Sequence, residues 1–236
     1  MPWLRKLLPI IAVVMIVAGV VAACGPAPSP SGSPSPTSSP AASVASPTPV
    51  ATALAVRELT GGTAPLAPGT YTRQAFRPQV VLTIGEGWFA GTVTNGFFDV
   101  QQDVGSPDVI AVQFAHVDGV ASAAASPLSA TTASAAVKAI HQNPTLTVVD
   151  ESASRMGGLE GLNVIVENRG TGPAPVLEVS AGTLSIDPGR KLWISFFDTP
   201  DGLLAVLVGG SIAQWERTLT VAEPVLESVL IGSPGA

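Results

Sequence analysis

The sequence predicts an α+β fold, in which an antiparallel β-sheet packs with one short and one long C-terminal α-helix. A signal helix and a disordered linker precede it. Short apolar runs recur between residues 69 and 208, and turns rich in Gly, Pro, Asn and Asp separate them, which is typical of strands. One short stretch with helical spacing interrupts these runs near residue 137, and a long apolar stripe closes the chain. A sheet with two segregated helices follows from this order.

The first 24 residues form a hydrophobic leader that ends at the only cysteine of the chain. Arg5 and Lys6 supply positive charge, residues 7–20 are apolar, and small residues lead into Cys24. Positive charge stays on the cytoplasmic side while the apolar segment enters the membrane, and small residues let the backbone fit a signal peptidase. The leader therefore predicts export.

Val21-Ala22-Ala23-Cys24 resembles the lipobox of bacterial lipoprotein precursors, which is an aliphatic residue, two small residues and a cysteine. The resemblance implies that the Cys24 thiol receives a diacylglycerol and that residues 1–23 are removed as a signal peptide. The mature chain would then be an extracytoplasmic protein of the cell membrane, anchored by lipid, since two acyl chains give a stable anchor. Two alternatives stay open: residues 7–23 remain as a transmembrane anchor, or an ordinary secretory signal is cut and the protein is released.

Residues 25–53 contain eight prolines, many Ser, Ala and Thr residues, and no charged residue. Proline fixes φ and removes backbone donors, so neither helix nor sheet can propagate, and almost no large apolar side chains are present to be buried. Together with the lipidated Cys24, this segment (24–53) is predicted to be a disordered tether of at most roughly 90 Å. Its Ser and Thr residues are compatible with O-glycosylation, and a bare solvated tether is the simpler alternative.

Residues 54–234 are long enough for a single α+β ectodomain with its own core. Gly69 to Phe76 and Gln79 to Ile84 form two expected strands around the Arg77-Pro78 turn. Further strands are expected where apolar residues alternate or run together between turns. They cover residues 97–100, 109–114, 146–150, 162–167, 176–179, 183–186, 191–197 and 203–208, whereas residues 118–130 are expected to form a loop.

The clearest hairpin joins the last two of these strands across Thr199-Pro200-Asp201-Gly202. Proline at the second position and glycine closing the turn fit a type I turn. The strand that follows, residues 203–208, is apolar on both faces. It is therefore predicted to be a central strand covered on both sides.

The first helix is predicted to begin after Thr131 or Thr132, which can cap free amides, and to end at Asn143-Pro144. The long helix is expected to start at Gly209-Gly210-Ser211, and Pro224 is expected to kink or divide it. Its apolar residues recur at steps of three and four, which predicts one stripe facing the core. That stripe is Ile212, Trp215, Leu219, Ala222, Leu226 and Val229.

Residues 69–231 also resemble uncharacterised bacterial lipoprotein ectodomains, which are similar in layout to the PsbP-like α/β/α sandwich. The resemblance implies an accessory or binding role and no enzymatic one, because that family is dominated by such proteins. It lies in the order of elements and in scattered residues. These are Gly69-Thr70-Tyr71, Gly87-Trp88, the joint His141 to Val148, Pro200-Asp201-Gly202, and Ala222 to Val229.

Charge and motifs exclude several functions. The net charge is −6, and the part beyond Arg5 and Lys6 holds nine basic and seventeen acidic residues, a net charge of −8. Such a chain is not expected to bind nucleic acid or to dock on anionic lipid headgroups.

Without a nucleophile elbow, a phosphate-binding loop or a thiol in the folded domain, no catalytic residue is predicted. His116, expected in a loop beside Asp118, and His141, expected at a helix end, give no local metal motif, so no metal or cofactor is predicted.

Glu86, Trp88 and Asp99 are the candidate residues of a ligand cleft. Carboxylates beside aromatic rings are used by clefts that handle sugars, and Phe97, Phe98 and Asp103 lie close by in the sequence. An aromatic cluster next to strands is more often part of a core. Both interpretations, a cleft and a part of the core, stay open.

These observations predict a membrane-anchored surface lipoprotein whose ectodomain is a non-catalytic binding or accessory module. Its partners would be membrane lipid, through the acylated Cys24, and a small ligand, a glycan or an envelope protein. The alternatives are a structural envelope component and an extracytoplasmic hydrolase that uses carboxylates near Trp88. A pocket of several hundred cubic ångströms with converging polar groups would favour the binding module.

The anchor can be tested by replacing Cys24. Because lipidation needs its thiol and precedes cleavage, Cys24→Ala should leave an uncleaved precursor without acyl groups. Intact-mass spectrometry and membrane fractionation measure both effects. Identical mass and membrane fraction for the two proteins would exclude the anchor.

Overall fold

The computed structural model describes residues 55–121 and 127–232. The leader, Cys24 and the tether lie outside the described residues, and predictions about them stay predictions. The described strands are β1 Val56–Glu58, β2 Gly69–Thr72, β3 Val80–Ile84, β4 Phe89–Val93, β5 Phe97–Gln102, β6 Ile110–Val120, β7 Thr147–Met156, β8 Leu159–Glu167, β9 Ala174–Val179, β10 Gly182–Ile186, β11 Arg190–Thr199, β12 Gly202–Ser211 and β13 Leu230–Ile231. The helices are α1 Ala133–His141, a 3-10 turn Ile212–Gln214, and α2 Trp215–Glu227.

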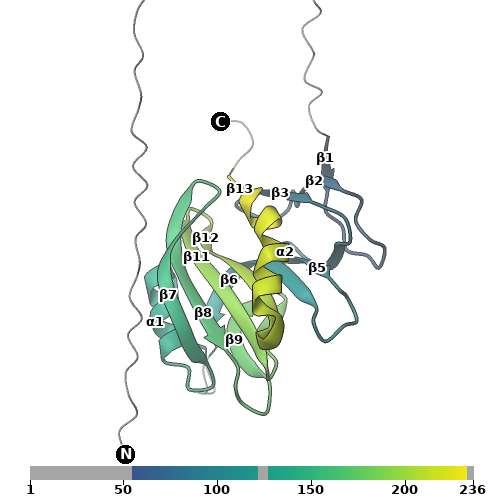
Figure 1. The fold of residues 1–236 in the computed structure, drawn as a ribbon. Coiled ribbons are helices and arrows are strands. Elements are labelled where there is room, and N and C mark those ends of the chain that lie inside the picture. The colour runs from purple at the N-terminus through teal and green to yellow at the C-terminus, as the bar shows by residue number, and fades with distance from the viewer. Residues whose placement is uncertain (1–54, 122–126, 233–236) are drawn as a thin grey trace, which may run out of the picture. The chain divides into compact units, whose positions relative to one another are not determined.

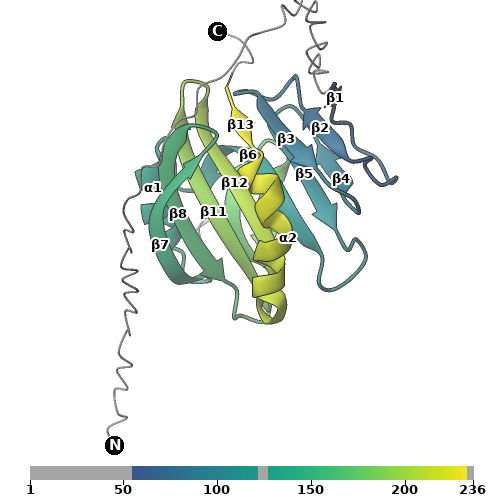
Figure 2. The same ribbon diagram turned by 45° about the horizontal axis from the view of Figure 1, so that its top comes forward.

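The strands form two sheets (Figures 1 and 2). The smaller sheet has the order β1-β2-β3-β13, and the larger sheet has the order β10-β9-β6-β12-β11-β8-β7, with β5 pairing β6 and β4 pairing β5. All the pairs between these strands are antiparallel except β1 on β2. The predicted fold class is confirmed: the strands are mostly antiparallel, and the longer of the two helices is C-terminal.

The predicted hairpin is β11 and β12, which pair residue by residue from Arg190↔Ser211 to Thr199↔Gly202. Gly202 closes the turn with φ +115°, a value that side chains disfavour. On its other side β12 pairs with β6, and all residues from Leu203 to Val208 are buried. The prediction of a central strand covered on both faces is confirmed.

The two faces of β12 belong to two different hydrophobic cores. Leu203, Ala205 and Leu207 face the core that α1 covers, together with Ala136 and Ile140 of that helix. The alternate residues of β12 (Leu204, Val206 and Val208) face the core that α2 covers. Because side chains alternate along a strand, one apolar strand supplies both cores.

Helix α1 follows its prediction. The Thr132 hydroxyl accepts a hydrogen bond from the Ala135 N–H at 3.2 Å and caps the helix, which ends at His141 just before Asn143-Pro144.

Helix α2 differs from its prediction in start and orientation. Gly209 and Gly210 belong to β12, which ends at Ser211. The Ser211 hydroxyl caps the 3-10 turn that precedes α2 by accepting from the Ala213 N–H at 3.2 Å. Pro224 lies inside one continuous helix and does not divide it. The buried stripe is Trp215, Thr218, Ala222, Val225 and Val229. Three residues of the predicted stripe are only half-buried: Ile212, Leu219 and Leu226.

The side of α2 that faces β12 is set by a steric effect at Gly210. A Cβ on Gly210 would overlap with the Thr218 Oγ1 and lie 2.6 Å from its Cγ2, so Thr218 occupies the space that a side chain would fill. The helix therefore packs on β12 through Thr218 instead of Leu219. Hydrophobicity alone does not reveal this contact.

Further predictions were wrong. The strand expected from Gly69 to Phe76 ends at Thr72, and residues 73–79 form a loop. Residues 118–120 belong to β6 and not to a loop, because β6 continues to Val120 to pair with β9. His116 accordingly lies inside β6, opposite Leu204, and is not a loop residue.

The close packing of α2 on β12 predicts different costs for two neighbouring glycines. Gly210→Ala forces Thr218 away and should lower the free energy of unfolding by about 1–3 kcal/mol. Gly209→Ala is the matched control, because its Cβ would meet only the Leu192 Cδ1 at 3.4 Å, an ordinary contact. Urea unfolding measures both variants, and equal losses would contradict the packing described.

Candidate functional site

A cavity of about 620 Å³ lies where three separate segments meet. They are the loop between β2 and β3 (residues 73–79), the β11–β12 turn, and the residue that follows β13. The lining residues are Gln74, Arg77, Pro78, Gln79, Pro200, Asp201 and Gly232. The volume lies in the range of small-ligand sites, and most of the lining residues are polar or charged.

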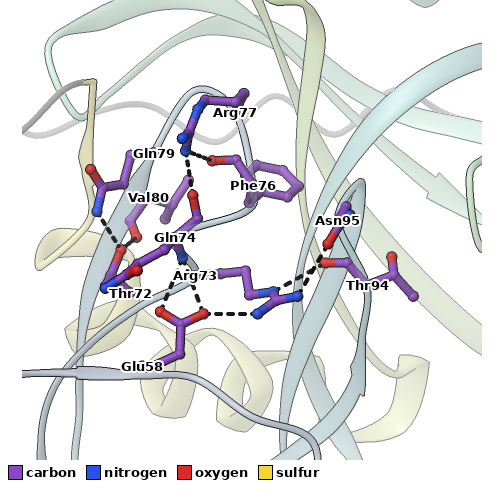
Figure 3. A network of polar contacts seen from close by, with 10 residues as sticks. All are labelled: Glu58, Thr72, Arg73, Gln74, Phe76, Arg77, Gln79, Val80, Thr94 and Asn95. Carbon is purple, nitrogen blue, oxygen red and sulfur yellow. Dashed lines mark hydrogen bonds and ion pairs between the residues drawn. The ribbon is translucent and has the colours of Figure 1, made fainter.

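The loop that carries Arg77 is anchored by its neighbours. Phe76 is completely buried, with its ring edge-on to Phe98 at 5.0 Å and against His116 at 4.8 Å between centroids. Pro78 is buried as well, and the Arg77–Pro78 peptide bond is cis. The Arg77 Nη1 donates to the carbonyl oxygens of Gln74 and Phe76, the latter at 3.1 Å, so the loop itself orients the guanidinium (Figure 3).

Glu58, at the end of β1, holds the start of this loop (Figure 3). Its carboxylate accepts from the Arg73 Nη1 at 2.8 Å and from the Gln74 N–H at 3.1 and 3.2 Å. Arg73 also donates to the Thr94 carbonyl at 3.4 Å and to the Asn95 Oδ1 at 3.1 Å. Arg73 therefore ties the loop to β1 on one side and to the β4–β5 turn on the other.

The end of the loop is held by the C-terminal segment. The Gly232 N–H donates to the Gln79 carbonyl at 2.9 Å, and the Gln79 Nε2 donates to the Thr72 Oγ1 at 3.0 Å. The first bond uses the Gln79 backbone carbonyl and the second its side-chain Nε2, so among the described residues no donor occupies its Oε1. Both ends of the loop are thus fixed without a ligand.

Two opposite charges, Arg77 and Asp201, line the cavity without forming an ion pair with each other. Arg77 and Asp201 are both exposed, and neither forms an ion pair within 4.0 Å with any residue that the structure describes. A guanidinium suits a carboxylate or phosphate group, and a carboxylate accepts from hydroxyl or amino groups. The cavity can therefore hold a polar ligand by charge and hydrogen bonds.

The cleft candidates from the sequence lie elsewhere. Glu86 is exposed, Trp88 is 4% exposed within the core under α2, and Asp99 is 2% exposed. None of them lines the cavity at Arg77. A buried Trp88 ring and an enclosed Asp99 carboxylate do not favour the hydrolase alternative, which needs carboxylates open to substrate.

Asp99 has a structural environment in the irregular pairing of β4 with β5. Its carboxylate accepts from the Thr92 N–H at 2.6 Å and from the Gln101 Nε2, and it lies on Gly91, where any side chain would collide with it. Burial raises the pKa of Asp99 above its ordinary value, and the hydrogen bonds from Gln101 and Thr92 only partly offset the rise.

The two histidines do not meet. His116 packs against Phe76, and burial lowers its pKa although Asp201 and Asp118 act in the opposite direction. The His141 Nε2 lies 2.8 Å from a carboxylate oxygen of Glu151 on the exposed side of α1. Among residues 55–121 and 127–232, no three His, Cys, Asp or Glu side chains gather closely enough to hold a metal ion.

The sequence predicts the turns at Arg77-Pro78 and Pro200-Asp201, but it does not predict that they lie side by side at the cavity. The two turns are more than 120 residues apart, and only the path of the chain through β6 and β12 brings them together. One signal was present in the sequence: Arg77 is a charged residue between Phe76 and Pro78, which suggests a loop anchored at both neighbours.

Comparisons with known proteins give structural similarity alone. No protein-family model matches the sequence, and a search of curated proteins finds no match either. The solution structure of cyanobacterial PsbP (CyanoP) from Synechocystis sp. PCC 6803 is similar with a TM-score of 0.39 and 12% identity, over 73% of this chain and 97% of that chain. The crystal structure of LpqN, involved in cell envelope biogenesis of Mycobacterium tuberculosis, is similar with a TM-score of 0.37 and 8% identity, over 72% of this chain and 90% of that one.

The resemblance to PsbP-like proteins expected from the sequence is thus confirmed only as weak structural similarity. At these scores it supports no argument about ligand or activity. In the described part of the chain, neither helix has the length and apolar character needed to cross a membrane.

The raised pKa of Asp99 predicts a pH-dependent stability. The native state holds the Asp99 proton more tightly than the unfolded chain does. Protonated Asp99 therefore adds to the free energy of unfolding at low pH, and this stabilisation is lost as the pH rises from about 4 through the folded pKa. Asp99→Asn keeps the shape without the charge, so its stability relative to the original protein should increase from pH 4 to pH 7 in urea unfolding.

Asp99→Ala provides the contrast. It leaves the Thr92 N–H without an acceptor and should cost about 1–3 kcal/mol at either pH. Parallel pH profiles for the original protein and the Asn variant would show that Asp99 is not the titrating group.

Proposed function

We propose that the chain is a lipid-anchored bacterial envelope protein whose single ectodomain binds a small polar ligand without catalysis. The observation that carries the proposal is the preformed cavity of about 620 Å³ that Arg77 and Asp201 line with opposite charges. Cavities of this size, with a few polar groups at fixed positions, are typical of small-ligand sites.

The anchor part of the proposal rests on the sequence. The positive n-region, the apolar segment and Val21-Ala22-Ala23-Cys24 support export and lipidation. Residues 24–53 would then separate the domain, residues 54–234, from the membrane. A binding site on a tethered domain can sample ligands at some distance from the lipid surface.

The ligand class follows from the groups in the cavity. Arg77 would contact a carboxylate or phosphate group, while Gln74, Gln79 and Asp201 would contact hydroxyl or amino groups. A glycan with an acidic group has this combination of functions. The fixed loop lowers the entropy lost on binding, because Glu58 and Gly232 hold both of its ends beforehand.

A structural envelope component is the second candidate, since the domain has two hydrophobic cores. The two functions differ in what the purified protein carries. A ligand-binding protein should retain or capture a small molecule, whereas a structural component should not.

The proposal predicts that removing the cavity's cation weakens binding. Native mass spectrometry of the chain purified from its own membranes, followed by an array of acidic and neutral glycans, identifies the ligand. Arg77→Ala should then weaken binding about tenfold or more, because a hydrogen-bonded charge contributes about 1.5–3 kcal/mol.

Lys138→Ala is the matched control, since it removes one exposed positive charge from α1, outside the lining of the cavity. Equal affinities for the original protein and the Arg77 variant would place the ligand elsewhere. Neither co-purified material nor binding on the array would favour the structural component.

A further inference from the structure

Strand β7 forms one edge of the larger sheet. Its outer side is open up to the hairpin loop, where Gly157 forms an isolated parallel bridge with Leu230 of β13. The order of that sheet ends at β7, which pairs only with β8 among the described strands (Figures 1 and 2). Helix α1 packs chiefly on β8, β11 and β6, and α2 on β12, β3 and β6. Most residues of β7 are exposed. An open edge of this length is a template for pairing with another strand.

The β7–β8 hairpin determines which backbone groups of β7 face outward. Gly157 and Gly158 form its two-residue loop with φ +57° and +85°, so Met156↔Leu159 is the closing pair and is hydrogen-bonded. Hydrogen-bonded and non-bonded pairs alternate in an antiparallel ladder. Glu151, Ala153 and Arg155 therefore direct their N–H and C=O groups away from the sheet.

The side chains at these three positions are complementary in charge to the same side chains of a second copy of the chain. In a two-fold antiparallel pairing centred on Ala153, Glu151 of each copy lies opposite Arg155 of the other. The pairing makes two charge pairs and about six backbone hydrogen bonds. Ser152 lies opposite Ser154, so no like charges face each other.

Neighbouring registers lack this complementarity. Centred on Ser152, the pairing places Arg155 opposite Val149, at the register shift between Val148 and Asp150, and it leaves Glu151 opposite Ala153. Centred on Glu151, it places two carboxylates together. Arg155 forms no ion pair within the described residues, and Glu151 contacts only the exposed His141. Both charges are accessible to a partner.

We propose that β7 is a self-association edge, through which two copies of the chain pair antiparallel about Ala153 with reciprocal Glu151–Arg155 contacts. The inference is independent of the cavity at Arg77. One paired edge buries less surface than stable dimers usually do, so the association is weak and reversible. Such a dimer is detected better by chemical cross-linking in the membrane than by sedimentation of the purified protein.

The test uses the full chain in its own membrane with Ala153→Cys. Directly opposite residues have Cα atoms about 5.5 Å apart, within reach of a disulfide, so mild oxidation should give a covalent dimer. Ala181→Cys, which changes an exposed residue in the β9–β10 turn, is the matched control. The parent chain corrects for any reaction of Cys24. We expect severalfold more dimer from the Ala153→Cys variant than from the Ala181→Cys variant.

Charge exchange then distinguishes specific pairing from random collision. Adding Glu151→Arg or Arg155→Glu to the Ala153→Cys chain should reduce the dimer to the level of the Ala181→Cys control. Co-expressing these two variants with different tags should restore a mixed dimer, because each arginine pair then faces a glutamate pair.

Three results would overturn the proposal. They are equal trapping at residues 153 and 181, no loss of dimer in the charge variants, and a disulfide from the new thiol at position 153 to a different protein. Melting temperatures of the variants show whether they are folded. Formation of the mixed dimer is a second check, because both charge variants must be folded to pair.

Discussion

The contact between Thr218 and Gly210 is the constraint on which much of this structure depends. Because Gly210 has no side chain, α2 can lie directly on β12 and cover the second core. The end of the helix then reaches the smaller sheet, where the Ser228 hydroxyl accepts from the Thr83 N–H at 2.8 Å and β13 pairs with β3. Gly232, the next residue, completes the wall of the cavity. A larger residue at position 210 would therefore disturb the core, the smaller sheet and the cavity together.

The cavity also depends on the first described strand. Glu58 ends β1 and binds both Arg73 and the Gln74 N–H, so the strand that follows the predicted tether also holds the loop that carries Arg77. The two ends of the described chain thus fix the two ends of this loop, through Glu58 and Gly232. Such a loop is organised before any ligand arrives, and little conformational entropy remains to be lost on binding.

The sequence predicted what depends on local pattern. Alternation and turn residues located the β11–β12 hairpin, and the apolar run at Leu203–Val208 identified a central strand. Thr132 and Asn143-Pro144 marked both ends of α1. What it missed depends on three-dimensional neighbours. Thr218 is buried because Gly210 leaves space, and residues 118–120 extend β6 because β9 offers a partner. The aromatic and acidic residues around Trp88 fitted either a cleft or a core, and Trp88 lies in the core. The cavity at Arg77 joins two turns that no local pattern connects.

Whether the Arg77 cavity holds a ligand can be seen in a crystal structure of the chain purified from its own membranes, without added ligand. We expect density for a small polar molecule between Arg77 and Asp201, with the Glu58–Arg73 contact at 2.8 Å. A cavity closed by the 73–79 loop, or a ligand bound elsewhere on the domain, would contradict this expectation.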